Sequence, residues 1–377
     1  MFDRVILGAA RVGVKEDSFD PPARFAILYF MSISPNSLAE TLGALLERRD
    51  LSAEQMQLAV SAFMAGSCSE AEMAGFLIAL RMKGETALEV ASAARVMRAH
   101  MVKVDSGRDD AIDTCGTGGD ASGTFNISTA SSFVVASCGV PVVKGGNRSV
   151  SSRCGSADVL EQLGVDIQLD AARARQCLDV AGWTFLFAPL FHPATKHVAG
   201  VRRQLKVRTL FNCLGPLVNP AQPAFHLMGV GKLELLDLMA GALAQLGCRH
   251  AFVLCSQDGL DEVSLAASTE VREVRSGTVT PQRWQPEDFG LVRCELAEVR
   301  VQSAEESAAL IESILAGEEG AAGRLVRANA AAALLAAERV ASLAEGVSCA
   351  REAISSGRAG AVLQRLRQFA ADSKANR

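Results

Sequence analysis

Four glycines fall within the stretch from Asp113 to Asn126, "DTCGTGGDASGTFN". Glycine loses more conformational entropy on folding than other residues, so this run indicates a tight turn or a backbone that closely approaches a ligand. The apolar residues behind it predict a helix from about Ile127. Because a helix N-terminus presents free N–H groups and a positive dipole end, the arrangement suits phosphate. It has neither Walker nor GxGxxG spacing, so a plain turn is the alternative.

The stretch from Lys144 to Ser149, "KGGNRS", follows a second expected strand, Val140 to Val143. Its lysine and arginine suit polyphosphate oxygens, and its glycines allow a ligand to approach the main chain. A solvated basic loop is the alternative. The position beside the first glycine turn favours a polyphosphate site.

An acidic turn from Asp258 to Glu262, "DGLDE", follows a third expected strand, "HAFVLCSQ". Carboxylates at a strand end can simply cap the next helix. Beside a polyphosphate, however, Asp261 and Glu262 would suit Mg²⁺, which takes a few carboxylates together with phosphate oxygens and water. The two glycine-rich turns therefore make this turn a candidate magnesium site.

A fourth segment, "GVRRQLKVRTLFNCLGPLVNP", combines several cations with a loop rich in proline and glycine. Either Arg202 or Arg203 could hold a carboxylate through a bidentate contact. The commoner alternative is that both arginines lie on a solvated face of a helix.

The residues before these motifs predict a small all-helical domain. Four Ser or Thr residues are each followed three positions later by Glu or Gln, the spacing of a capping box, and by apolar residues at helical intervals. The pairs are Ser37–Glu40, Ser52–Gln55, Ser69–Glu72 and Thr86–Glu89. We expect about four helices that end near Met101.

Beyond about residue 102, short apolar strands alternate with helices, which predicts an α/β domain with a mostly parallel central sheet. Ligands bind beyond the carboxyl ends of such strands, so the three polar turns should lie along one edge. The expected division is a possible N-terminal extension over 1–30, a helical domain over 31–104 and an α/β domain over 105–377. Met31 is an alternative start of the chain.

The composition disfavours several other classes of function. The formal net charge of -4 gives no electrostatic footprint for nucleic acid or an anionic membrane surface. None of the ten cysteines forms a CxxC pair, which disfavours a zinc site and favours a reducing cytosol. No apolar run approaches the ~20 residues that span a bilayer, and the start lacks a signal-peptide core. We expect a cytoplasmic protein that binds neither nucleic acid nor membrane.

In combination, the motifs resemble those of the anthranilate phosphoribosyltransferases. They are "GTGGD", "TFNIST", "KGGNRSVSSRCGSADVLEQLG", "FAPLFHPATKHVAGVRRQLKVRTLFNCLGPLVNP" and "DGLDEVS", with "GFLIALRMKGET" in the helical region. The resemblance covers about Leu38 to Leu363 and implies a homodimer whose subunits have the nucleoside phosphorylase type of fold. It also implies transfer of the phosphoribosyl group of phosphoribosyl pyrophosphate (PRPP) to the amine of anthranilate, the second step from chorismate to L-tryptophan, with two Mg²⁺ ions per subunit.

The same resemblance implies site residues, position by position. For PRPP they come from the glycine-rich turns, the helix between them and the segment that follows: Gly116, Gly119, Asp120, Thr124, Asn126, Ile127, Ser128, Thr129, Lys144, Gly145, Gly146, Asn147, Arg148, Ser149, Val150, Ser151, Ser152 and Ser156. For anthranilate they are Gly116, Asn147 and Arg202, with Arg202 on the carboxylate. For magnesium they are Ser128, Asp261 and Glu262. We nominate no general base, because a neutral aromatic amine needs chiefly correct placement.

Two positions depart from the family pattern. Gly145 stands where the family has histidine, which removes an imidazole from beside the acceptor and predicts altered acceptor affinity or selectivity. Lys206 stands where the family usually has glycine. Neither departure touches the residues implied for Mg²⁺.

Three alternative functions fit parts of the same residue pattern. A same-fold phosphoribosyltransferase with a different aromatic amine as acceptor is supported only by Gly145, and the retained Asn147 and Arg202 disfavour it. A pyrimidine nucleoside phosphorylase would share the fold, but the complete set of motifs disfavours it. A non-catalytic nucleic-acid binder should be basic and should have lost Asp261 and Glu262, whereas this chain has a net charge of -4.

Overall fold

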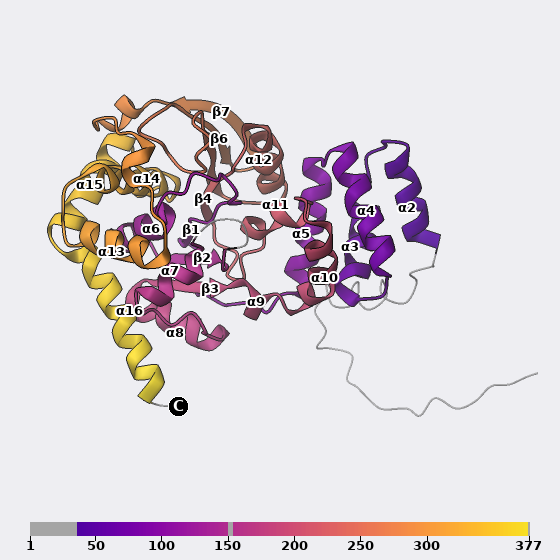
Figure 1. The fold of residues 1–377 in the computed structure, drawn as a ribbon, viewed down its shortest axis with the longest axis horizontal. Helices are drawn as coiled ribbons and strands as arrows, with labels where there is room; N and C mark the ends of the chain where they lie inside the picture. The colour runs from indigo at the N-terminus through magenta and orange to yellow at the C-terminus, as the bar shows by residue number, and fades with distance from the viewer. Residues whose placement is uncertain (1–35, 150–153, 376–377) are drawn as a thin grey trace, which may run out of the picture.

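The computed structural model describes residues 36–149 and 154–375. The expectations for residues 1–30, for Met31 and for Val150, Ser151 and Ser152 fall outside them. A bundle of helices lies beside a larger part in which helices surround a sheet (Figure 1). The helices are α2 (Asn36–Leu46), α3 (Ala53–Ala65), α4 (Glu70–Lys83), α5 (Ala87–His100), α6 (Ile127–Ser137), α7 (Ser156–Gln162), α8 (Ala171–Ala181), α9 (Ala188–Phe191), α10 (Lys196–Leu205), α11 (Phe211–Leu214), α12 (Leu236–Gln245), α13 (Ala304–Leu315), α14 (Ala321–Ala336), α15 (Leu343–Ser355) and α16 (Arg358–Ala375). The strands are β1 (Ile112–Asp113), β2 (Val142–Gly146), β3 (Trp183–Phe187), β4 (Phe225–Gly229), β5 (His250–Ser256), β6 (Thr269–Arg275) and β7 (Thr278–Trp284).

Capping boxes begin three helices of the N-terminal bundle. In each, the Ser or Thr side chain accepts a hydrogen bond from the backbone N–H three residues later, and the Glu or Gln there accepts one from the cap residue's N–H. These contacts satisfy N–H groups that a helix start leaves without an intrahelical partner. Three of the predicted boxes are confirmed: Ser52–Gln55, Ser69–Glu72 and Thr86–Glu89. The fourth is wrong, because α2 begins at Asn36 and already includes Ser37.

Segments from much later in the chain complete this bundle. Helix α10 packs against α3 and α4, and α12 packs against α5. Val198 of α10 and Met239 of α12 are fully buried in one hydrophobic core with Phe63 and Phe76, whose rings meet edge to face at 5.2 Å between centroids. The division of the chain at particular residues into a helical and an α/β domain stays a prediction.

The sheet has seven strands in the order β3-β2-β1-β4-β5-β6-β7. Strands β1 to β5 pair in parallel, and β6 and β7 continue the sheet in antiparallel pairing at one edge. Strand β1 has only two residues but lies between β2 and β4, where Ile112 pairs with Val142 and with Phe225. The predicted α/β fold class with a mostly parallel sheet is confirmed.

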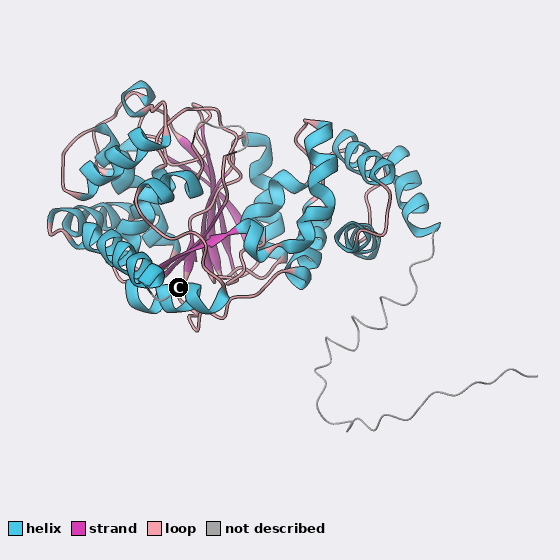
Figure 2. Ribbon diagram, turned by 60° about the horizontal axis from the view of Figure 1, so that its bottom comes forward, coloured by secondary structure: helices cyan, strands magenta, loops and turns pink. Residues whose placement is uncertain are grey.

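Helices cover both faces of the sheet, as Figure 2 shows. Successive side chains of a strand point to opposite faces, so a sheet covered on both sides needs continuous apolar strands. In β5, Phe252 and Leu254 belong to the core that contains α6 and α14. Ala251 and Val253 belong to the core shared with the helical bundle. The bundle is therefore attached to the sheet by a common apolar core.

The antiparallel edge is formed by a tight hairpin that we had not expected. Ser276 and Gly277 connect β6 to β7, and their φ angles of 48° and 82° match a two-residue hairpin turn of type I′. Pro281 lies in β7, the edge strand, where its missing N–H costs no ladder hydrogen bond.

Helix α14 lies against α6 and contacts β4, β5 and α15. Its Asn329 is fully buried, accepts a hydrogen bond from the N–H of Val263 at 2.9 Å and donates to the carbonyl oxygen of the same residue at 3.0 Å. A C-terminal helix thus fixes the segment that follows the acidic turn. Over the ranges that the structure describes, no helix is both long and apolar enough to cross a membrane.

Candidate active site

The glycine turn after β1 is fixed by another turn, the one that follows β4. The N–H of Thr117 donates to the carbonyl oxygen of Gly229 at 2.9 Å, and a Cβ on Gly116 would lie only 2.8 Å from that same oxygen. Gly118 and Gly119 have φ angles of 63° and 83°, which residues with side chains rarely adopt. The protein's own backbone therefore requires glycine at these positions.

The start of α6 is the second part of the site. The helix begins at Ile127, as predicted, after Asn126, whose side chain makes no capping hydrogen bond to it. The N–H of Ser128 donates to Oε1 of Glu262 at 3.1 Å. The Oγ1 atom of Thr129 is buried and has no hydrogen-bond partner among the described residues. Asn126 therefore leaves the first turn of its own helix open to other acceptors.

Lys144 supplies a buried cation, but from a strand and not from a loop. The expected strand Val140 to Val143 is wrong at both ends, because β2 begins at Val142 and continues to Gly146. The Lys144 side chain is 1% exposed, and its Nζ donates to the carbonyl oxygen of Thr114 at 2.8 Å and to Oγ of Ser128 at 3.3 Å. Strand pairing thus holds the ammonium group between the glycine turn and α6.

The acidic turn follows β5 and brings two half-buried carboxylates, those of Asp261 and Glu262. Burial raises the pKa of Asp261, and the nearby charge of Asp120 raises it further. Burial also raises the pKa of Glu262, followed by the charge of Asp261, whereas Lys144 and a hydrogen bond from Ser128 act in the opposite direction. An added cation would therefore be stabilised beside these carboxylates.

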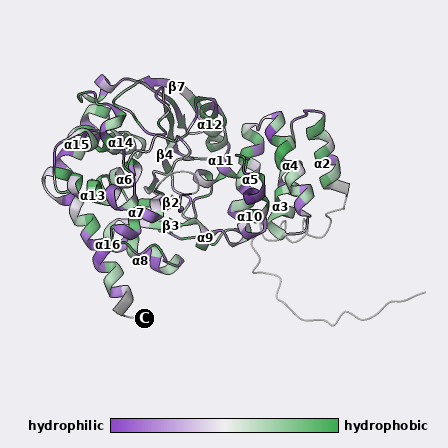
Figure 3. Cartoon of the chain, viewed as in Figure 1, coloured by the Kyte–Doolittle hydropathy of each residue, from purple (hydrophilic) through white to green (hydrophobic). Residues whose placement is uncertain are grey.

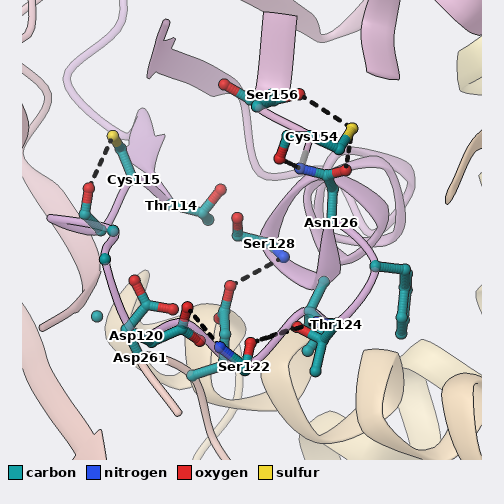
Figure 4. A pocket seen from close by; sticks show the side chains of 18 of the residues that line it. Thr114, Cys115, Asp120, Ser122, Thr124, Asn126, Ser128, Cys154, Ser156 and Asp261 are labelled. Carbon is teal, nitrogen blue, oxygen red and sulfur yellow. Dashed lines mark hydrogen bonds between the residues drawn. The ribbon is translucent and has the colours of Figure 1, made fainter. Parts of the chain in front are cut away.

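These segments surround a cavity of about 200 Å³ (Figure 4). The three polar turns do meet at one edge of the sheet, since Gly116, Lys144 and Glu262 all line this cavity, which confirms the expected arrangement. Around the hollow in Figure 4, Asp120 and Asp261 lie near one another, with Ser128 and Asn126 on the α6 side. The predicted site residues that line the cavity are Gly116, Gly119, Asp120, Thr124, Asn126, Ile127, Ser128, Lys144, Gly145, Ser156, Asp261 and Glu262.

The other described residues predicted for the site do not line this cavity: Thr129, Gly146, Asn147, Arg148, Ser149 and Arg202. Arg148 points to α7, where its guanidinium pairs with Glu161 at 2.6 Å and with Asp158 at 3.1 Å. Asn147 is exposed, and its Oδ1 accepts a hydrogen bond from the N–H of Arg148 at 2.8 Å. A ligand that recruited Arg148 would have to compete with these two carboxylates.

Arg202 and Arg203 differ in their surroundings on α10. Arg203 is exposed, whereas the guanidinium of Arg202 lies over the ring of Phe211, with Cζ 5.7 Å from the ring centroid. Burial lowers the pKa of Arg202. Lys206 ends the helix with a φ of 53°, a left-handed conformation that glycine adopts more readily, which accounts physically for glycine in the family pattern.

Gly145 lies beside a buried polar network. A Cβ there would lie 3.2 Å from Oδ2 of Asp113 and 3.4 Å from Nδ2 of Asn219. Nδ2 of Asn219 donates to Oδ2 of Asp113 and to the carbonyl oxygen of Val143, both at 2.7 Å, and the N–H of Gly145 donates to Oδ1 of Asp113 at 3.2 Å. Burial raises the pKa of Asp113 to about 6, although the charge of Lys144 acts to lower it.

Sequence reasoning missed other residues that line the cavity. They are Thr114, Cys115, Gly118, Ser122, Gly123, Phe125, Cys154, Gly155, Leu227, Gly229 and Val301. Gly229 had a signal, because "AFHLMGVG" is another apolar stretch that ends in glycines, like the strands before the first two turns. Val301 had none, since it reaches the cavity beside the isolated antiparallel bridge between Thr124 and Arg300.

Two family models match the chain. Residues 39–101 match the helical bundle domain of a glycosyl transferase family, and residues 108–360 match the a/b domain of a glycosyl transferase family. An anthranilate phosphoribosyltransferase from Thioalkalivibrio sulfidiphilus is 48% identical over 334 residues, which are 89% of this chain and 99% of that protein. One from Symbiobacterium thermophilum is 48% identical over 323 residues, 86% of this chain and 95% of that protein.

Solved structures agree with these sequence matches. The anthranilate phosphoribosyltransferase of Thermus thermophilus superposes with a TM-score of 0.82 at 40% identity, covering 88% of this chain and 99% of that one. The enzyme of Saccharomyces cerevisiae in complex with PRPP and Mg gives a TM-score of 0.83 at 27% identity, covering 90% and 99%.

Proposed function

The chain belongs to the anthranilate phosphoribosyltransferase family, and we propose that its pocket is the active site for that family's reaction. The protein transfers the phosphoribosyl group of PRPP to the amine of anthranilate, which gives N-(5-phosphoribosyl)anthranilate and pyrophosphate, in tryptophan biosynthesis. The observation that carries the assignment of the pocket is the meeting of the glycine turn, the start of α6 and the two carboxylates of the acidic turn around one cavity.

PRPP occupies this cavity, with its phosphates against the glycine turn and α6. The turn supplies main chain without side chains, and α6 supplies the positive end of its dipole. Lys144 adds a fixed positive charge, whose buried position makes it more effective than a solvated lysine. Asn147, Arg148 and Ser149 do not line the cavity, so they reach the ligand only if their segment moves toward it.

The residues present fit a magnesium site. Asp261 and Glu262 are half-buried carboxylates whose pKa values are raised, so a divalent cation would compensate the cost of their charge. Together with Ser128 they would hold Mg²⁺, which supplies charge neutralisation for the phosphate oxygens. Asp120 lines the same cavity, and this third carboxylate supports our proposal of two ions per subunit.

Anthranilate binds between α10 and the carboxyl end of β2. Arg202 has no ion pair or hydrogen bond on its guanidinium among the described residues, so it is available for a carboxylate through a bidentate contact. Asn147 and Gly116 complete this acceptor site. Gly145 leaves the space beside Asp113 and Asn219 without a side chain, so the acceptor's ring has more room there than an imidazole would allow.

The chain's own groups lower the barrier chiefly by electrostatics and placement. Cleavage at the anomeric carbon builds positive charge on the ribose and negative charge on the departing pyrophosphate, as in other reactions at sugar carbons. Lys144 and the α6 dipole stabilise the departing charge. By binding the carboxylate, Arg202 holds anthranilate so that its amine is placed for attack. No protein base is assigned to the amine.

Two further properties belong to the proposal. We infer a homodimer, since Leu46, Ile78 and Met82 are 72%, 36% and 70% exposed, and α2 and α4, which carry them, are neighbours in the bundle. Figure 3 shows the hydrophobic colouring of α2 at the outer end of that bundle.

We also infer a cytoplasmic location, which the cysteines support because all ten are described and none forms a disulfide.

The test is the loss of anthranilate fluorescence when the purified protein is mixed with PRPP and Mg²⁺. A rapid loss that EDTA abolishes and excess Mg²⁺ restores is the expected result. If fluorescence persists while calorimetry shows that PRPP binds, the acceptor is a different aromatic amine, and Gly145 is where the specificity would have changed. If PRPP does not bind either, the assignment of the pocket is wrong.

A further inference from the structure

Asn126 occupies the cap position of α6 but is bonded elsewhere. Its side-chain Oδ1 accepts hydrogen bonds from Oγ of Ser307 at 2.8 Å and from Sγ of Cys154 at 3.1 Å. Its backbone N–H donates to the same Ser307 oxygen at 3.1 Å, and its Nδ2 donates to the carbonyl oxygen of Cys154 at 3.3 Å. Figure 4 shows the contacts between Asn126 and Cys154 at the wall of the pocket.

Ser307 is the partner that determines this arrangement. It is fully buried on α13, 181 residues further along the chain, and its hydroxyl both accepts from and donates to Asn126. The accepted N–H fixes the direction in which the hydroxyl hydrogen points, and the donated bond then fixes which end of the amide is oxygen. Asn126 therefore presents its Nδ2 side in a single orientation.

The consequence concerns the first turn of α6. An asparagine at a helix cap ordinarily accepts a hydrogen bond from the N–H of the second or third helical residue. Here that acceptor is turned away and makes no such bond. Within the described residues, Oγ1 of Thr129, the third helical residue, is also buried without a partner. The N–H of Ser128 is already held by Glu262, so what the orientation of Asn126 keeps available for an anionic ligand is the Thr129 end of this turn, its N–H and its hydroxyl.

We propose that Ser307 is a positioning residue of the PRPP site, which acts by holding the Asn126 amide away from the start of α6. The inference rests on the proposed function, because the ligand at the helix start is taken to be a phosphate group of PRPP. Without the Ser307 hydroxyl, the Asn126 side chain is free to rotate and cap α6. The cap would then compete with the phosphate for the N–H of Thr129, the third helical residue.

The test compares Ser307→Ala with Ser131→Ala. Ser131 is an equally buried serine on α6 whose hydroxyl donates to a backbone carbonyl, that of Val326, at 3.3 Å. For S307A we expect the Kd of PRPP with Mg²⁺, measured by calorimetry without anthranilate, to rise about tenfold. The KM for anthranilate should stay the same. For S131A, PRPP binding should equal that of the wild type.

A double-mutant cycle separates positioning from packing. In an Asn126→Ala background, the Ser307→Ala change should have no further effect on the Kd, because the amide side chain that Ser307 positions is no longer present. An additive effect, or an S307A variant that binds PRPP like the wild type, would overturn the inference. If S307A does not fold, Ser307→Cys serves instead, since it keeps only a weak thiol donor at this position: a threefold or larger rise in the Kd, as an order of magnitude, supports the inference and no rise overturns it. A wild-type protein that binds no PRPP would overturn the proposed function and this inference with it.

Discussion

The folded protein should lose stability as Asp113 ionises. This carboxyl group is 1% exposed, and burial raises its pKa to about 6 from the ordinary 3.8, although Lys144 and hydrogen bonds from Asn219 and Gly145 act to lower it. A raised pKa means that the folded state binds the proton more tightly than the unfolded state does. The stabilisation is therefore complete below pH 3.8 and is lost as the pH rises through about 6.

The size of the effect follows from the two pKa values. At ~1.4 kcal/mol for each pKa unit, the gap between them is worth about 3 kcal/mol, of which about 2 kcal/mol falls between pH ~4.5 and ~8. Asp113→Asn has nearly the same shape and does not titrate. Its changed hydrogen bonds shift the free energy of unfolding by a constant amount, which cancels when two pH values are compared.

The assay is equilibrium unfolding in urea followed by tryptophan fluorescence, which reports Trp183 on β3 and Trp284 on β7, both buried and both in the same sheet. The free energy of unfolding of the wild type, minus that of D113N, should fall by about 2 kcal/mol from pH ~4.5 to ~8. Asp109→Asn, the same exchange at an exposed position, is the control. A flat or rising difference for D113N would refute the buried, desolvated state of Asp113.

Three further predictions concern the ligands. Arg202→Ala should raise the KM for anthranilate roughly 10- to 100-fold with little change for PRPP, whereas Arg203→Ala should leave both unchanged; steady-state kinetics decide. Replacing Asp261 and Glu262 by Asn and Gln should lower Mg²⁺-dependent turnover at least about 100-fold without unfolding the protein, and retained turnover in the fluorescence assay would remove their metal role. Thr129→Val should raise the free energy of unfolding by about 1 kcal/mol but weaken PRPP binding in calorimetry, since its buried hydroxyl lacks a partner among the described residues.

The sequence alone predicted those features that depend on residues close together in the chain. A capping box needs only residues three positions apart, so those beginning with Ser52, Ser69 and Thr86 could be found from the sequence. The start of α6 at Ile127 could be predicted in the same way, from the apolar residues that follow it. Parallel pairing then places the carboxyl ends of neighbouring strands at one edge, which is why Gly116 and Glu262 could be expected together.

Non-local contacts decided what the sequence could not predict. Strand β2 continues through Lys144 to Gly146 because these residues pair with Phe185, Leu186 and Phe187 of β3, which lies far along the chain. Arg148 turns from the expected ligand to Glu161, an ion pair that only the position of α7 creates. The β6–β7 hairpin does not depend on such non-local contacts. The Ser276-Gly277 pair between two alternating segments is a local pattern that predicts a two-residue hairpin turn.

The packing of α6 against α14, α15 and α16 has a consequence for synthesis of the chain. The helix whose start forms the phosphate site is made before the helices that bury its apolar face, which follow it in the chain by more than 180 residues. Asn329, which fixes the segment after the acidic turn, also lies on α14. A nascent chain that has emerged only as far as β7 therefore exposes this apolar face and has no complete pocket. We expect PRPP to be unable to assist folding of the growing chain until α14, α15 and α16 have emerged and packed against α6.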